Sequence, residues 1–110
     1  MAGGLHKFTV AEAENVGLGQ TGNAFVDDTD KYEPPDGTVI IAITMLSNAN
    51  FTELTPESTS FWCGNSSSPG TNGTAVSTDS FPNGVTIYGR WLSFTLQTTT
   101  SDRVLCYFAP

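Results

Sequence analysis

Residues 81–94 read Phe-Pro-Asn-Gly-Val-Thr-Ile-Tyr-Gly-Arg-Trp-Leu-Ser-Phe, and this stretch decides the fold. The Pro-Asn-Gly opening is a turn signal, and the β-branched and aromatic residues after it predict a strand. Apolar side chains occupy odd positions from Val85 to Trp91 and even positions from Leu92 to Leu96. Because alternate residues of a strand point to opposite faces, this change of phase near Gly89 predicts a β-bulge or a strand that passes between sheets.

Other apolar segments are expected to complete the sheet. Thr38–Leu46 is the most apolar run and rich in β-branched residues, which predicts a central strand. Ser47–Asn50 is expected to be a hairpin turn, with Phe51–Leu54 as the returning strand. Arg103–Phe108 is expected to pair antiparallel with Trp91–Thr98. Shorter extended segments are expected at Leu5–Val10, Asn23–Val26, Phe61–Cys63 and Ala75–Ser77. The predicted fold is all-β, a small antiparallel sandwich or barrel (jelly-roll-like) of about seven to eight short strands.

The residue totals exclude several classes of function. A chain of 110 residues is expected to form one β domain, residues 1–110, in which residues 1–10 are a candidate extended N-terminal arm. Lys and Arg total 4 against 11 Asp and Glu, for a formal charge of −7. So few bases argue against nucleic acid and anionic membrane surfaces as partners. No apolar run approaches the roughly 20 residues that span a bilayer, and no signal peptide is visible.

The two cysteines, Cys63 and Cys106, leave two interpretations open. They could form one disulfide, or they could be buried free thiols that pack as small apolar groups. With no secretion signal in view, the free thiols are favoured. Sequons at Asn50, Asn65 and Asn72 are about as many as chance gives in a chain so rich in Ser and Thr, and they carry little weight.

No constellation of side chains predicts catalysis or metal binding. His6 is the single histidine, so it has no second histidine for a metal site. Asp27–Glu33 holds four carboxylates but lacks the spacing of a calcium loop, which favours a solvated acidic loop. Glu53 and Glu57 flank a proline turn, and nothing places them across a cleft. The sequence therefore predicts a protein that is not an enzyme, with no catalytic residues, cofactor or metal.

Three aromatic residues, Trp62, Tyr88 and Trp91, could form a platform on which sugars stack. The simpler interpretation places both tryptophans in the core and Tyr88 at an interface, because apolar periodicity already accounts for Trp91. Arg90, one of two arginines, is expected to pair with a carboxylate of its own chain or of a neighbour.

The C-terminal third resembles a pattern found in small virion proteins of tailed bacteriophages, of the marine or cyanobacterial phage type. That pattern runs Pro-x-Gly-Val-Thr-Ile-Tyr-Gly-Arg-Trp, then an apolar strand, a polar turn and a strand ending near Tyr. The matching residues here are Pro82, Gly84–Trp91, Phe94, Leu96, Val104 and Tyr107. The turn at Thr99–Asp102 departs from the pattern because it lacks a glycine.

The resemblance implies a structural protein of the virion, assembled in the host cytoplasm. Its expected role is that of a capsid decoration (cement) protein that binds the major capsid protein or other virion proteins as a homo-oligomer, with a trimer favoured. The candidate interface residues are Leu5, Lys7, Phe8, Tyr88 and Arg90. The alternative is a tail or head fibre module that binds a receptor or carbohydrate. A third class, a secreted glycoprotein domain, would need a Cys63–Cys106 bridge.

Overall fold

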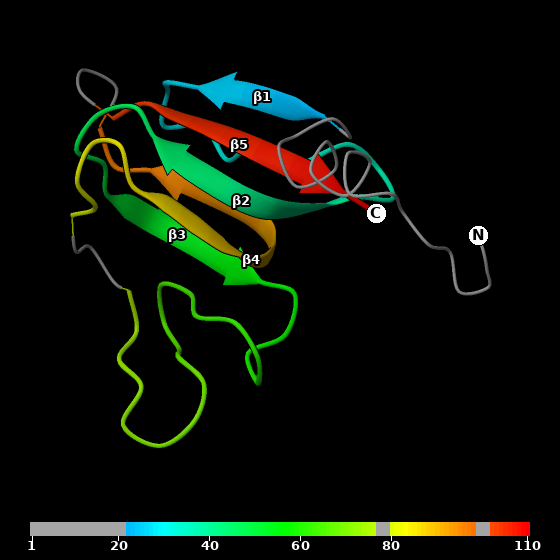
Figure 1. The fold of residues 1–110 in the computed structure, drawn as a ribbon, viewed down its shortest axis with the longest axis vertical. Helices are drawn as coiled ribbons and strands as arrows, with labels where there is room; N and C mark the ends of the chain where they lie inside the picture. The colour runs from blue at the N-terminus through cyan, green and yellow to red at the C-terminus, as the bar shows by residue number, and fades with distance from the viewer. Residues whose placement is uncertain (1–21, 77–79, 99–101) are drawn as a thin grey trace, which may run out of the picture.

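The protein folds as a single antiparallel β-sheet whose inner face encloses the core. A computed structural model describes residues 22–76, 80–98 and 102–110, and within these ranges it contains no helix. The strands are β1 (Asn23–Val26), β2 (Val39–Met45), β3 (Phe51–Pro56), β4 (Thr86–Leu96) and β5 (Val104–Ala109). They lie side by side in the order β1-β5-β2-β4-β3 (Figure 1).

β2 is the central strand that its β-branched sequence predicts. It is paired antiparallel with β5 on one side and with β4 on the other. Ile40, Ile43 and Met45 are completely buried, and they contribute to the main hydrophobic cluster. Burying large aliphatic side chains contributes about 1.5–3 kcal/mol each, so these residues of β2 contribute several kcal/mol to the stability of the sheet.

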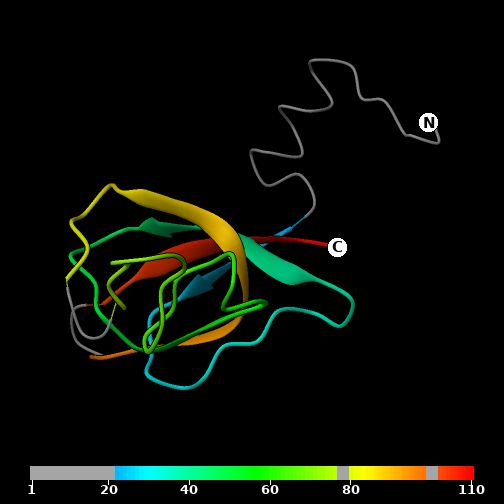
Figure 2. The same cartoon turned by 90° about the horizontal axis from the view of Figure 1, so that it is seen from below.

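β4 is long and strongly curved, and its bulge lies where the sequence predicts one. Ile40 lies opposite Trp91, and Ala42 lies opposite Tyr88, so two steps along β2 match three along β4. The extra residue falls at Gly89–Arg90 and bends the strand. The first half of β4 pairs with β2 and the second half with β3, and Figure 2 shows the strand arching over the fold.

Aromatic side chains fill the space that the curved strand encloses. Phe51 meets Phe94 edge-on at 5.6 Å between ring centroids and Phe81 at 5.7 Å. Tyr32 lies 5.4 Å from Phe94, and the two residues also exchange backbone hydrogen bonds of 2.8 and 3.2 Å. Tyr32 therefore fixes the 27–38 loop to the side of β4 that β3 does not occupy.

Several sequence predictions about pairing are wrong. The described residues form five strands rather than seven to eight. β2 and β3 do not form a hairpin, because Ala49 bridges to Phe81 and β4 lies between the two strands. β5 pairs with β1 and β2 instead of β4. Phe61–Cys63 lies in a turn rather than a strand.

The loop of residues 57–76 is held by polar contacts that its composition does not suggest. Residues 64–74 carry no large apolar side chain, yet Gly64 is buried. A Cβ at Gly64 would lie 2.5 Å from the Leu54 carbonyl oxygen. The Asn65 N–H donates to that same oxygen at 3.1 Å, and the Leu54 N–H donates to Asn65 Oδ1 at 3.1 Å. This loop is thus fastened to β3 through backbone groups.

Candidate interaction face

The side of the sheet turned away from the core carries the candidate site. Cα partners on neighbouring antiparallel strands point their side chains to the same face. The register therefore groups eight residues into two rows on the side opposite the core, here called the outer face. One row is Phe25, Leu105, Thr44 and Thr86, and the next is Asn23, Tyr107, Ala42 and Tyr88.

The outer face is uncharged and partly apolar. None of its eight residues is Asp, Glu, Lys, Arg or His, in a chain whose formal charge is −7. Tyr88 is 73 % exposed and Phe25 is 55 % exposed, whereas Ala42 is only 3 % exposed between its tyrosine neighbours. The hydroxyl oxygens of Thr44 and Thr86 lie 2.8 Å apart and hydrogen-bond to each other. Because the two hydroxyls bond to each other, they lose fewer hydrogen bonds to water when this face is covered, which favours contact with another protein surface.

Of the predicted interface residues, Tyr88 lies on the outer face. Arg90 is not one of the outer-face residues, because its side chain pairs with Glu57. The Arg90 guanidinium forms a two-bond pair with Glu57, with Nε–Oε1 at 2.7 Å and Nη2–Oε2 at 3.2 Å. The hydrogen bond from Arg90 lowers the pKa of the Glu57 carboxyl. Arg90 therefore has the carboxylate of its own chain that the sequence allowed. Leu5, Lys7 and Phe8 lie outside the described residues.

The alternative of a sugar platform built from Trp62, Tyr88 and Trp91 does not form, because Trp91 lies in the core. Trp91 is 1 % exposed, and its indole N–H donates to the Cys63 carbonyl oxygen at 2.8 Å. A Cβ at Gly89 would lie 2.8 Å from the Trp91 ring and 3.0 Å from the Trp62 ring. The glycine therefore leaves the space beside the backbone that both rings occupy. Trp91 is a core residue, as its periodicity predicts.

Sequence reasoning missed Phe25, Leu105 and Tyr107 as members of the outer face. Each was expected in a strand, but their placement beside Tyr88 depends on β5 lying between β1 and β2. Asn23–Val26 and Val104–Tyr107 carry apolar residues at consecutive positions, so their sequences do not indicate which side chains face outward. Their outward faces can be assigned only once the strand order is known.

The acidic side chains outside the outer face serve other backbone and hydroxyl groups. The Asp102 carboxylate is 3 % exposed, and its Oδ2 accepts from the backbone N–H groups of Asn50, Gln97 and Thr98 at 3.4, 3.2 and 3.1 Å. Glu53 accepts hydrogen bonds from a cluster of hydroxyls: Thr55, Ser93 at 2.8 Å and Thr95 at 3.2 Å. Among the described residues, no group of three or more His, Cys, Asp or Glu side chains could hold a metal ion.

The two cysteines form no disulfide bond, and the thiol of one of them is held in its neutral form. Cys63 and Cys106 are free, and Cys106 is completely buried in the core. Burial raises the pKa of the Cys106 thiol to about 11, against a smaller lowering by the hydrogen bond from Tyr32. Burial raises the pKa of Tyr32 to about 12, with further contributions from the charge of Cys106 and the hydrogen bond to it. Both groups are therefore neutral at physiological pH.

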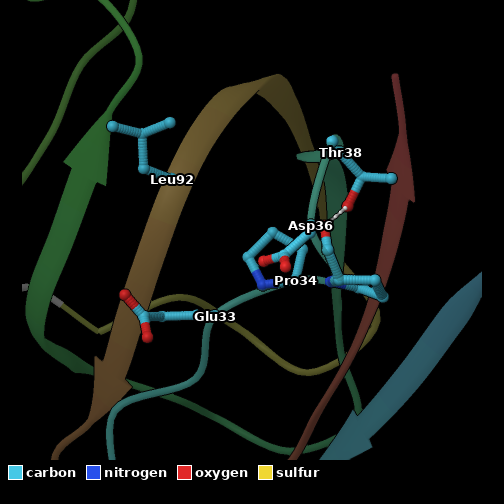
Figure 3. Close-up of a pocket in the computed structure, with 7 residues that line it drawn as sticks. Glu33, Pro34, Asp36, Thr38 and Leu92 are labelled. Carbon is cyan, nitrogen blue, oxygen red and sulfur yellow. Dashed lines mark hydrogen bonds between the residues drawn. The ribbon is translucent and has the colours of Figure 1, made fainter.

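A hollow of about 420 Å³ lies beside Leu92 of β4. Residues 33–38 and Leu92 line it, and Figure 3 shows the Glu33 and Asp36 carboxylates there, with the Thr38 hydroxyl donating to the Pro35 carbonyl at 2.6 Å. Both acids are exposed, and the hollow is open to solvent. Its lining contains no histidine, lysine, arginine or cysteine beside these acids.

No protein-family model, curated protein or solved structure matches this chain. Within the described ranges, no helix has the length and apolar character that crossing a bilayer requires.

Proposed function

We propose that the chain is a non-enzymatic structural protein of a bacteriophage virion, a decoration or cement protein whose outer face docks on the capsid shell. The observation that supports this role is the uncharged outer face with its exposed Tyr88 and Phe25. Protein interfaces are enriched in aromatic residues and depleted of charge at their centres. Tyrosine anchors are frequent among the residues that dominate binding energy.

The charge of the chain favours one face over the rest of the surface for this contact. With 11 acidic residues, most approaches of a second acidic protein are repulsive. The two rows of the outer face carry no charge, so they can lose water against a partner without stranding an ion. The virion setting itself comes from the resemblance of residues 81–107 to small phage virion proteins.

The first test counts copies in purified particles of the phage that encodes the chain. Quantitative mass spectrometry measures the ratio of this protein to the major capsid protein. A cement protein is expected at hundreds of copies, in a fixed ratio to the shell. Absence from the particles would contradict the virion role, and a few tens of copies or fewer would assign the chain to a fibre or tail part instead.

The second test asks whether the outer face makes the contact. Recombinant chain is added to particles that lack it, and bound protein is measured after sedimentation. Tyr88→Lys is expected to weaken binding about 100-fold, because it puts a charge at the centre of the contact. Thr52→Lys is the matched control, since Thr52 is exposed on β3, outside the outer face. Equal binding by both variants would contradict docking through the outer face.

A carbohydrate- or receptor-binding module is the second candidate, and one observation favours it. Phe61 is 73 % exposed, and its ring meets that of Trp62 at 5.8 Å in an edge-on pair on the 57–76 loop. A glycan array tests this role, with Phe61→Ala as the variant and Tyr88→Lys as the control. Glycan binding that Phe61→Ala abolishes and Tyr88→Lys leaves intact would favour the fibre module over the cement protein.

A further inference from the structure

β1 forms an edge of the sheet that no described residue covers. The Phe108 N–H donates to the Gly22 carbonyl at 3.0 Å, which fixes the phase of the β1–β5 ladder. Hydrogen-bonded and non-hydrogen-bonded pairs alternate along an antiparallel ladder. Ala24 and Val26 therefore bond to β5, while the N–H and C=O groups of Asn23 and Phe25 point away from it. Figure 1 shows β1 at the end of the row of strands.

The opposite edge of the sheet is closed by Asn65. Leu54 is the residue of β3 whose N–H and C=O point away from β4, and Asn65 satisfies both groups at 3.1 Å. Asn65 Nδ2 also lies 3.4 Å from the Thr52 carbonyl oxygen, which it reaches as a donor. This side chain and its backbone imitate a neighbouring strand, so another chain cannot extend the sheet at β3. The β3 edge of the described sheet is therefore closed by Asn65, whereas the β1 edge is open.

From this asymmetry we infer that β1 pairs antiparallel with β1 of a second copy of the chain across a twofold axis. Of the two edges of the described sheet only the β1 edge is open, so the contact is isologous, with the same patch on both copies. The axis passes beside Ala24. Asn23 then faces Phe25 of the second copy, and each residue both donates and accepts a backbone hydrogen bond. Strand addition at an open edge obtains affinity from these main-chain bonds.

The charges next to β1 select the antiparallel arrangement. β1 is itself uncharged, but Asp27, Asp28 and Asp30 follow directly, and all three are exposed. In a parallel arrangement each aspartate would lie about 5 Å from the same aspartate of the second copy, and the two like charges would repel each other. In the antiparallel register Asp27 lies six positions along the ribbon from Asp27 of the second copy. That separation is about 20 Å, beyond the screening length of about 8 Å at physiological salt.

The exposed ring of Phe25 provides the side-chain part of the contact. In this register Phe25 lies diagonally across the axis from Phe25 of the second copy, on the same face of the sheet. Diagonal neighbours about 7–8 Å apart are within reach of aromatic side chains. β1 also lacks the usual protections of an edge strand, since it contains no proline, lysine or inward-pointing charge. The dimer would join the two outer faces into one continuous surface.

Sedimentation equilibrium of the isolated full-length chain tests this inference without any particle or capsid protein. The inferred dimer goes beyond the proposed virion role, so either proposal can fail while the other stands. The wild-type chain is expected to be a dimer. Phe25→Lys should raise the dissociation constant about 100-fold, because two lysines meet across the axis. Tyr88→Lys is the matched control: it adds the same charge to the same face, three strands from the edge, and should remain dimeric.

Asn23→Pro provides a second variant that acts on the backbone alone. It removes the outward N–H of the first residue of β1, a position where an edge strand tolerates proline, and should give a folded monomer. Far-ultraviolet circular dichroism confirms the fold of each variant. A monomeric wild type, a trimer, or a dimer that survives both Phe25→Lys and Asn23→Pro would overturn the inference. A dimer lost in Tyr88→Lys but kept in Phe25→Lys would move the contact to the centre of the outer face and overturn it as well.

Discussion

The indole N–H of Trp91 donates a 2.8 Å hydrogen bond to the Cys63 carbonyl oxygen, so a buried core residue of β4 also fastens the 57–76 loop. Trp91→Phe removes this donor and part of a fully buried ring. We expect a loss of about 2–4 kcal/mol in the free energy of unfolding, from the cavity and the lost hydrogen bond together. Urea unfolding measures it, and limited proteolysis should cut the loop faster. Trp62→Phe is the control, because Trp62 is only partly buried. A Trp91→Phe variant as stable as Trp62→Phe would contradict this role.

The Asp102 carboxylate caps the connection between β4 and β5. Asp102→Ala leaves the N–H groups of Gln97 and Thr98 without this acceptor in a partly buried setting, and hydrogen bonds to charged groups contribute about 1.5–3 kcal/mol each. We expect Asp102→Ala to lose at least about 3 kcal/mol of unfolding free energy, and Asp102→Asn to lose less because it keeps an oxygen acceptor. Asp36→Ala, at an exposed position, should be nearly neutral. Equal stability of Asp102→Ala and Asp36→Ala in thermal unfolding would disprove the capping role.

Glu53 serves as the shared acceptor for hydroxyls on β3 and β4. Glu53→Ala should destabilise the chain by about 2–3 kcal/mol, since Ser93 is 3 % exposed and loses the acceptor of its hydroxyl. Glu53→Gln keeps one acceptor oxygen and should fall between Glu53→Ala and wild type. Chemical denaturation gives the order, with Glu33→Ala as the exposed control. The reverse order of the two Glu53 variants would show that the hydroxyls do not depend on this carboxylate.

Cys106 predicts how stability falls at high pH. Its thiol has a pKa of about 11 in the folded protein, raised by burial from the ordinary value of 9.0. Between these pH values the unfolded thiol releases its proton while the folded one keeps it, so the free energy of unfolding decreases as pH rises. The slope for this group is about 1.4 kcal/mol per pH unit, and it vanishes below pH 9. Urea midpoints from pH 8 to 10 measure the slope, because above pH 10 the raised pKa of Tyr32 adds a slope of its own. Cys106→Ala should flatten it and Cys63→Ala should not; an equal effect of both would refute the assignment.

Local pattern was enough to predict the two longest strands and the bulge. The β-branched run around Ile43 needs burial on an extended backbone, and the phase change at Gly89 can be satisfied only by a break in register. These features depend on neighbouring residues alone. The all-β class follows from the same local preferences, and the five described strands agree with it.

Strand order could not be predicted, because it depends on contacts between segments far apart in the sequence. Phe51–Leu54 follows Met45 after a short polar turn, so a hairpin was the economical expectation. The bridge from Ala49 to Phe81 brings the next segment in instead. Tyr32 and Asn65 show the same difficulty, since each satisfies backbone groups of a strand from within a loop. Neither residue has a local signature for that task.

The candidate site was predicted in part. The exposed ring of Tyr88 lies on the outer face, as the polar phase of its strand indicated. Phe25 and Tyr107 join it only through the strand order, and Arg90 turned instead to Glu57. A register of four strands is needed before these positions can be recognised as one surface.

The place of β5 governs when the molecule can fold. Residues 104–109 lie between β1 and β2, and none of the five described strands is joined to its neighbour in the sheet by a tight hairpin that could form early. During synthesis β1 lacks its β5 partner until residue 109 has left the ribosome, so the described sheet cannot be completed earlier and its non-local pairing makes folding slow. Until then the edge of β2 that pairs with β5 remains open in the nascent chain, and this is the interval in which a chaperone would bind it.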